Sequence, residues 1–155
     1  MKTFSVLLAV LFCFISLPLF AQSDFDADLT REISLFEGKR KALVSDSMQL
    51  TERETEAFWP GFTEHQEASR EVIVRRIKVV RSYIKEQKAL SDEKAAFLLD
   101  ELLAIEEDRL KLIKAYMKKF GKILPPRKVM RFFQLESAME AGFYYEVIQN
   151  ILPAK

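Results

Sequence analysis

One short stretch, Leu50–His65 (LTERETEAFWPGFTEH), combines a strong helix start with a residue that disfavours helix. Thr51 is followed three positions later by Glu54, the spacing of a capping box, in which each side chain bonds the backbone N–H of the other residue. This pattern predicts a helix that begins at Glu52. Pro60 lacks a helical donor and crowds the preceding turn, so we expect the helix to kink or break there.

Three aromatic residues, Phe58, Trp59 and Phe62, surround Pro60 in the same stretch, and Trp59 is the only tryptophan of the chain. We interpret the cluster as core that fills the space around the kink. The alternative is an exposed aromatic surface that binds a client protein.

The N-terminal segment has the pattern of a secretory signal peptide. Lys2 is the only charged residue before Asp24, residues 4–20 are almost wholly apolar, and Ala21 suits the position before a cleavage site. We therefore predict a signal peptide over residues 1–21 and one domain over residues 22–155. An uncleaved membrane anchor is the alternative, because the uncharged run is long enough to span a bilayer.

Composition narrows the class of the remaining chain. Removing residues 1–21 takes one of the 24 basic residues and none of the 23 acidic ones, so the net charge becomes zero, which gives no support for nucleic acid or an anionic membrane as a partner. Cys13, the only cysteine, is removed with residues 1–21, so the remaining chain is expected to have no disulfide and no thiolate site. Four glycines and five prolines are few for a β protein, so helix is favoured.

Apolar periodicity predicts an all-α fold of four helices over residues 24–48, 52–88, 92–120 and 127–150, with Ser91 as the cap of the third. We expect a cradle-like antiparallel bundle with a long, kinked second helix. The third helix carries two parallel apolar stripes, a face wide enough to contact more than one partner. These stripes are Leu98, Leu102, Ile105, Leu112 and Tyr116, and Leu99, Leu103, Leu110, Ile113 and Met117.

The second helix has a basic face and the third begins acidic, and a short connection predicts that the two pack antiparallel. The expected neighbours are Arg81 with Asp100, Lys78 with Glu101, and Arg75 with Glu106. We interpret them as solvated cross-helix pairs. The alternative is that Arg75, Lys78 and Arg81 belong to a basic binding surface.

The motifs resemble a known group of proteins. The Leu50-Thr51-x-x-Glu54 start is similar to the L-T-x-x-Q motif of Spy/CpxP-like periplasmic stress proteins, with Glu for Gln. A closer resemblance is to the branch labelled sensor of ECF-type (extracytoplasmic-function) sigma factor, carried by Phe58-Trp59-Pro60, Leu124-Pro125-Pro126-Arg127-Lys128 and Arg131-Phe132-Phe133-Gln134-Leu135-Glu136. The likeness covers residues 43–148. It implies a periplasmic stress sensor or adaptor, or an ATP-independent chaperone, acting on a protein partner or an unfolded client through a curved helical surface.

Catalytic and metal chemistry find little support. The chain has no glycine-rich phosphate loop and no nucleophile motif, so we expect no enzyme and no cofactor. His65 is the only histidine, and the residues three and four positions away on the helix are poor ligands, so we favour a packing or surface role. The alternative function is a periplasmic metal-binding sensor that uses His65. Whether the protein forms a homodimer is left open.

Overall fold

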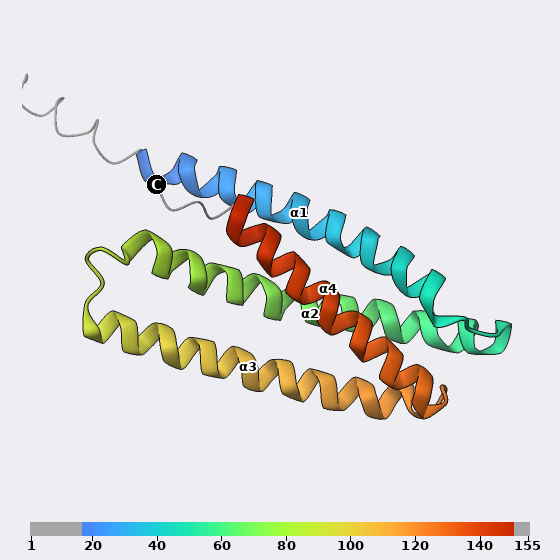
Figure 1. Cartoon of the computed structure of the whole chain (residues 1–155). Helices are drawn as coiled ribbons and strands as arrows, with labels where there is room; N and C mark the ends of the chain where they lie inside the picture. Colours follow the sequence, from blue (N-terminus) through green and yellow to red (C-terminus); the bar gives the residue numbers. More distant parts are fainter. Residues whose placement is uncertain (1–16, 151–155) are drawn as a thin grey trace, which may run out of the picture.

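The computed structural model describes the backbone of residues 17–150 and the side chains of residues 24–150. Its four helices are α1 (Leu17–Met48), α2 (Glu52–Glu86), α3 (Asp92–Phe120) and α4 (Pro126–Asn150). Figure 1 shows α2 and α3 as a long antiparallel hairpin, with α4 crossing it diagonally and running antiparallel to α1. The predicted all-α class and the four helices are confirmed.

The helix starts have the predicted caps. The Thr51 backbone N–H donates to Glu54 Oε2 at 2.8 Å, and the Glu54 N–H donates to Thr51 Oγ1 at 3.3 Å, so both halves of the capping box form. Ser91 Oγ accepts from the Lys94 N–H at 3.2 Å and starts α3. Each cap satisfies donors that the first helical turn leaves without intrahelical acceptors.

The turn between α3 and α4 also follows the sequence. Gly121 ends α3, and its N–H donates to Met117 O at 2.9 Å. Its φ of −63° is right-handed, so the stop does not use the left-handed geometry that glycine often supplies. Pro126 is the first residue of α4, a position that needs no backbone donor.

Of the two outcomes expected at Pro60, a kink or a break, the break does not occur, because α2 continues through Pro60 from Glu52 to Glu86. Pro60 is exposed and Gly61 beside it is buried. A Cβ built on Gly61 would lie 3.1 Å from a ring carbon of Phe120, so glycine lets α2 and α3 approach closely at this point.

The predicted signal peptide lies for the most part outside the described residues. Its proposed end at Ala21 falls within the first turns of α1, whose side chains are described only from Asp24. Within the described part of the chain, no helix is long and apolar enough to cross a membrane.

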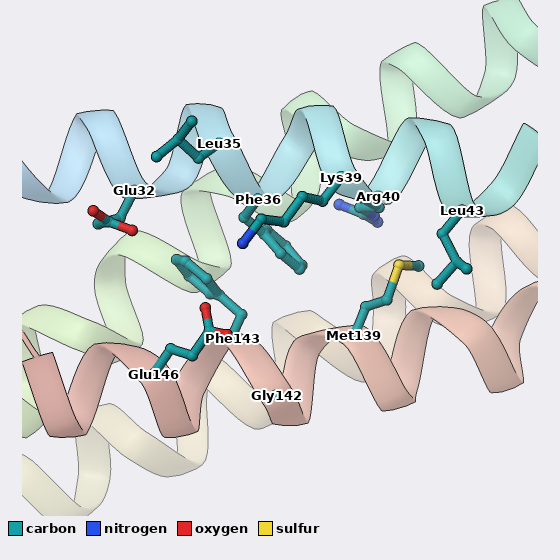
Figure 2. Close-up of a pocket in the computed structure, with 10 residues that line it drawn as sticks. All are labelled: Glu32, Leu35, Phe36, Lys39, Arg40, Leu43, Met139, Gly142, Phe143 and Glu146. Atoms are coloured by element: carbon teal, nitrogen blue, oxygen red, sulfur yellow. The ribbon is translucent and has the colours of Figure 1, made fainter.

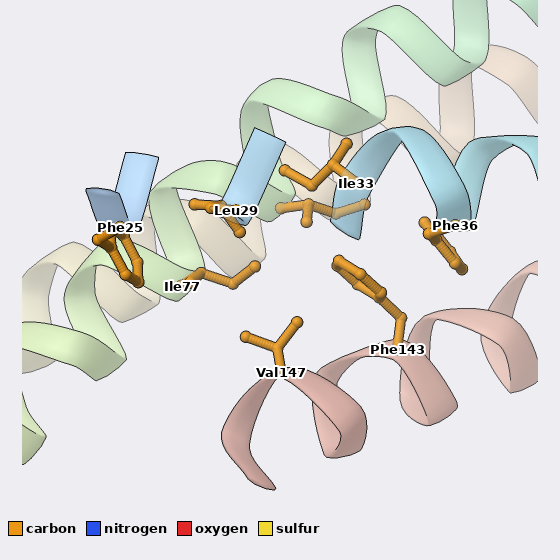
Figure 3. Packing of buried hydrophobic residues seen from close by; sticks show 8 residues of the cluster. Phe25, Leu29, Ile33, Phe36, Ile77, Phe143 and Val147 are labelled. Carbon is orange, nitrogen blue, oxygen red and sulfur yellow. The ribbon is translucent and has the colours of Figure 1, made fainter. Parts of the chain in front are cut away.

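Two apolar clusters make up the core. The mixed cluster joins α1, α2 and α4, and Figure 3 shows how Phe36 and Phe143 stack within it. The aromatic cluster lies near the α3–α4 turn and draws on all four helices. The mixed cluster consists of Phe25, Leu29, Ile33, Phe36, Ile73, Ile77, Phe143 and Val147, and the aromatic cluster of Val44, Met48, Phe58, Phe62, Phe120, Leu124, Val129 and Phe132.

Candidate interaction surface

A buried ionic group, Arg40–Glu136–His65, joins α1, α4 and α2 beside the two apolar clusters. Arg40 Nε donates to Glu136 Oε1 at 2.8 Å, and Arg40 Nη2 donates to Glu136 Oε2, so the pair is bidentate. The same Nη2 lies 2.9 Å from His65 Nδ1. The guanidinium also lies 5.9 Å from the ring centroids of Phe36, in the mixed cluster, and Phe62, in the aromatic cluster.

Burial shapes the protonation states of this group. Loss of solvation, reinforced by the adjacent Arg40 cation, lowers the pKa of His65 to about 3. Burial also lowers the pKa of Arg40 to about 10, against the opposing effect of Glu140 and Glu37. At neutral pH His65 is therefore a neutral acceptor for Arg40, and the charged pair is Arg40 with Glu136.

These contacts place His65 in the core, so of the two roles left open by the sequence, packing or surface, the structure shows packing. Its ring meets Tyr116 and Phe132 at centroid distances of 4.8 and 5.5 Å. Its Nδ1 accepts from the Arg40 guanidinium, and the positive charge of Arg40 repels a metal cation. Among the described residues no group of three or more histidine, cysteine, aspartate or glutamate side chains could hold a metal ion.

The aromatics around Pro60 divide between core and surface. Phe58 and Phe62 are 0% exposed and pack against Phe120 and Phe132. Neither ring offers surface to a client, so the favoured core interpretation holds for Phe58 and Phe62 and the client-binding alternative does not. Trp59 is half-buried and has Lys41 over its ring at 5.6 Å.

The basic face of α2 makes cross-helix contacts in a register slightly different from the expected one. Arg75 pairs with Asp108 at 2.8 Å, two residues beyond the expected Glu106. Glu106 instead pairs with Arg76. Arg81 turns to α1, where its guanidinium lies 3.4 Å from the centroid of Phe25.

Lys78, the third member of the predicted basic surface, is exposed. Within the described residues it forms no ion pair with the expected Glu101. With Arg75 on Asp108 and Arg81 on Phe25, these three side chains do not form one free basic row.

The two apolar stripes of α3 have different environments. The first stripe packs toward the hairpin core, where Leu98 and Ile105 are buried. Of the second stripe, Leu99, Leu103, Leu110 and Met117 are all exposed. Four exposed large apolar side chains along one helix are unusual for a protein without a partner, which makes this stripe the strongest sign of an interaction surface.

The hairpin tip adds a groove to this surface. The tip is the end of α2, the connection to α3 and the start of α3, and Figure 1 shows it extending beyond the end of α4. Its groove has a volume of about 330 Å³ and is lined by Val79, Val80, Tyr83, Leu90, Ala95, Leu98, Leu99 and Leu102. No charged side chain lines it, so it suits an apolar segment of a partner.

A second groove, of about 250 Å³, lies between α1 and α4. Figure 2 shows Phe36 and Phe143 meeting in its floor beside Gly142, with Glu32 and Glu146 at one end and Lys39 above it. Its charged rim distinguishes it from the groove at the tip.

Comparison with known proteins adds no family: no family model, no curated protein and no solved structure matches this chain.

Proposed function

We propose that the protein is a non-enzymatic stress-response protein of the periplasm, a sensor or adaptor or an ATP-independent chaperone, that binds apolar segments of other proteins at the hairpin tip. The observation that carries the proposal is the groove of the tip, whose lining is apolar and aromatic and which continues into exposed Leu99. Such a site gains binding energy from burial of apolar surface without requiring a particular sequence.

The arrangement of the core supports this assignment. The aromatic cluster and the Arg40–Glu136–His65 group lie away from the tip, so a substitution at the tip can alter binding without disturbing them. The export of the chain and its role in stress rest on the N-terminal pattern and on the motif resemblance to the Spy/CpxP-like proteins. The metal-sensor alternative is not carried further, because His65 is occupied by Arg40.

The test is suppression of the aggregation of a chemically unfolded client, measured by light scattering. We expect Leu99→Ser to reduce suppression several-fold while the melting temperature stays within a few degrees of the parent protein, because Leu99 is 61% exposed.

Leu35→Ser is the matched control, since Leu35 is also an exposed leucine, 53% accessible, but lies in the α1–α4 groove. If Leu35→Ser abolishes suppression and Leu99→Ser leaves it intact, binding belongs to the α1–α4 groove and the proposal for the tip is wrong. No suppression by the parent protein would argue against the chaperone branch of the proposal.

A further inference from the structure

A pocket lies where the end of α1 meets the start of α4, at the end of the molecule away from the hairpin tip (Figure 1). Its volume is about 590 Å³, which is enough room for a small molecule. The polar side chains that line it are Ser47, Gln49, Arg127, Lys128, Arg131 and Gln134. Three of these are basic, and none of the described side chains that line the pocket is acidic.

The charge of Lys128 is already balanced within the fold. Its Nζ donates to Gln49 O at 2.7 Å and to Glu54 Oε2 at 2.6 Å, which ties the start of α4 to the end of α1 and to the capping box of α2. The hydrogen bond from Lys128, together with that from the Thr51 backbone, lowers the pKa of Glu54. Lys128 therefore fixes one wall of the pocket and keeps Glu54 as its counter-charge.

Arg127 and Arg131 carry the positive charge that is left. Both are exposed, and neither guanidinium forms an ion pair or a hydrogen bond within residues 24–150. Residues four apart on a helix have Cβ atoms about 5–6 Å apart, so the two side chains can reach one bound group. Gln134 lies three positions after Arg131 on α4 and adds an amide to the same wall.

Arginines elsewhere in the fold are used differently. Arg70, Arg75 and Arg109 each pair with a carboxylate of another helix, at 3.0, 2.8 and 3.1 Å. The groove between α1 and α4 is lined by acidic as well as basic side chains. The pocket at the start of α4 differs from both cases, because its two unpaired guanidinium groups face no carboxylate of the described chain and are free for a ligand.

We propose that this pocket binds the phosphate group of a phosphomonoester, held by Arg127 and Arg131. The planar fork of a guanidinium matches two phosphate oxygens. A phosphomonoester carries a charge of about −1.5 to −2 at pH 7, which matches two arginines, whereas a carboxylate carries one charge and is satisfied by one fork. The Gln134 amide and the Ser47 hydroxyl are donors for the remaining oxygens. The inference goes beyond the proposed function and does not rest on it.

Isothermal titration calorimetry with glycerol phosphate, at constant ionic strength, tests the pocket. The parent protein is expected to bind one equivalent per chain, and Arg127→Gln and Arg131→Gln should each weaken binding roughly tenfold. Their melting temperatures should equal that of the parent protein, because both side chains are exposed and unpaired. Acetate should bind at least about tenfold more weakly than glycerol phosphate, and equal affinities would overturn the assignment to phosphate.

A matched control separates the pocket from the charge of the whole chain. Lys85→Gln with Lys88→Gln removes two exposed positive charges at the tip, and this variant should bind glycerol phosphate like the parent protein. Arg127→Gln with Arg131→Gln changes the net charge by the same amount and should abolish binding. Equal losses in the two double variants would show that the ligand responds to net charge alone and would overturn the proposal.

Vesicles distinguish a soluble ester from a lipid headgroup. Phosphatidic acid carries the same phosphomonoester, so the protein is sedimented with phosphatidylcholine vesicles that contain or lack it. Binding of glycerol phosphate without sedimentation indicates a soluble ligand, and sedimentation with phosphatidic acid that the Arg127→Gln, Arg131→Gln variant loses indicates a lipid headgroup; either result supports the site. Absence of binding in both experiments, or binding that this variant retains, would overturn the proposal.

Discussion

The two ends of the α2–α3 hairpin use similar residues in opposite ways. At the end near the α3–α4 turn, Phe58, Phe62, Phe120 and Phe132 are 0% exposed, because α1 and α4 cover the hairpin there. At the tip, Phe97, Leu99 and Tyr83 are at least half exposed. The same apolar composition thus supplies stability where four helices meet and a binding surface where the α2–α3 hairpin extends past α4.

This contrast explains why composition alone does not locate the site. The hydrophobic effect rewards any burial of apolar area, so the core and the surface draw on the same residue types. What separates them is the path of α4, which runs diagonally toward α1 and leaves the first half of α3 uncovered (Figure 1). The exposed residues are therefore available to a partner outside the fold.

The largest expected effect compares one aromatic residue from each end. Phe132→Ala should cost about 3–5 kcal/mol of unfolding free energy, because a buried ring is removed and a cavity remains. Phe97→Ala, on the exposed side of the tip, should change stability by less than about 0.5 kcal/mol. Chemical denaturation of the two variants measures both values, and similar losses would show that the tip is as much a part of the core as the aromatic cluster.

Removing one charge of the buried ionic group should lower the free energy of unfolding strongly, whereas replacing both charges with apolar residues should lower it little. Glu136→Gln should destabilise by about 3–5 kcal/mol, because it leaves the Arg40 cation buried without its carboxylate partner. Replacing both members, Arg40→Met with Glu136→Leu, should recover most of that loss. If the double variant is as unstable as Glu136→Gln in denaturant melts, the charged pair itself adds stability that two apolar side chains do not replace.

A smaller effect follows from the pKa of His65. Its value of about 3 in the folded protein lies below the ordinary value of 6.5, so the unfolded chain takes up the proton first as pH falls. Stability from neutral His65 is thus complete above pH 6.5 and is lost as pH falls from 6.5 toward 3. Lowering the pH from 7.5 to 5 should therefore reduce the free energy of unfolding by about 2 kcal/mol through His65.

The matching variant is His65→Gln, which keeps an acceptor for Arg40 but does not titrate. In denaturant melts, the free energy of unfolding should fall less between pH 7.5 and pH 5 for His65→Gln than for the parent protein, since all other titrating groups are common to both. Equal losses would mean that His65 is not held neutral by the fold.

Much of the fold was predictable from the sequence because helix boundaries depend on local chemistry. Thr51 with Glu54, Ser91, Gly121 and Pro126 mark the helix ends of the structure. At Pro60 the sequence left a kink or a break open, and the break does not occur, because packing of the flanking aromatics holds α2 together at the cost of one backbone bond.

The buried ionic group was missed, although the sequence carried a signal for it. Arg40 lies four residues after Phe36 and four before Val44, in an apolar row of α1, and Glu136 lies four residues after Phe132 in α4. Opposite charges in two apolar rows indicate a buried pair. Which stripe of α3 stays exposed could not be predicted, because that depends on the crossing of α4 and not on α3 itself.

Amide hydrogen exchange of the protein, free and with an unfolded client, tests most directly whether the tip binds while the aromatic end only stabilises. In the free protein, amides near Phe62 and Phe132 should exchange far more slowly than those near Phe97, because they open only with the core. Client binding should then slow exchange near Tyr83 and over residues 92–103 and leave the aromatic end unchanged. Protection that appears around Phe62 and Phe132, with none at the tip, would contradict the assignment of the two ends.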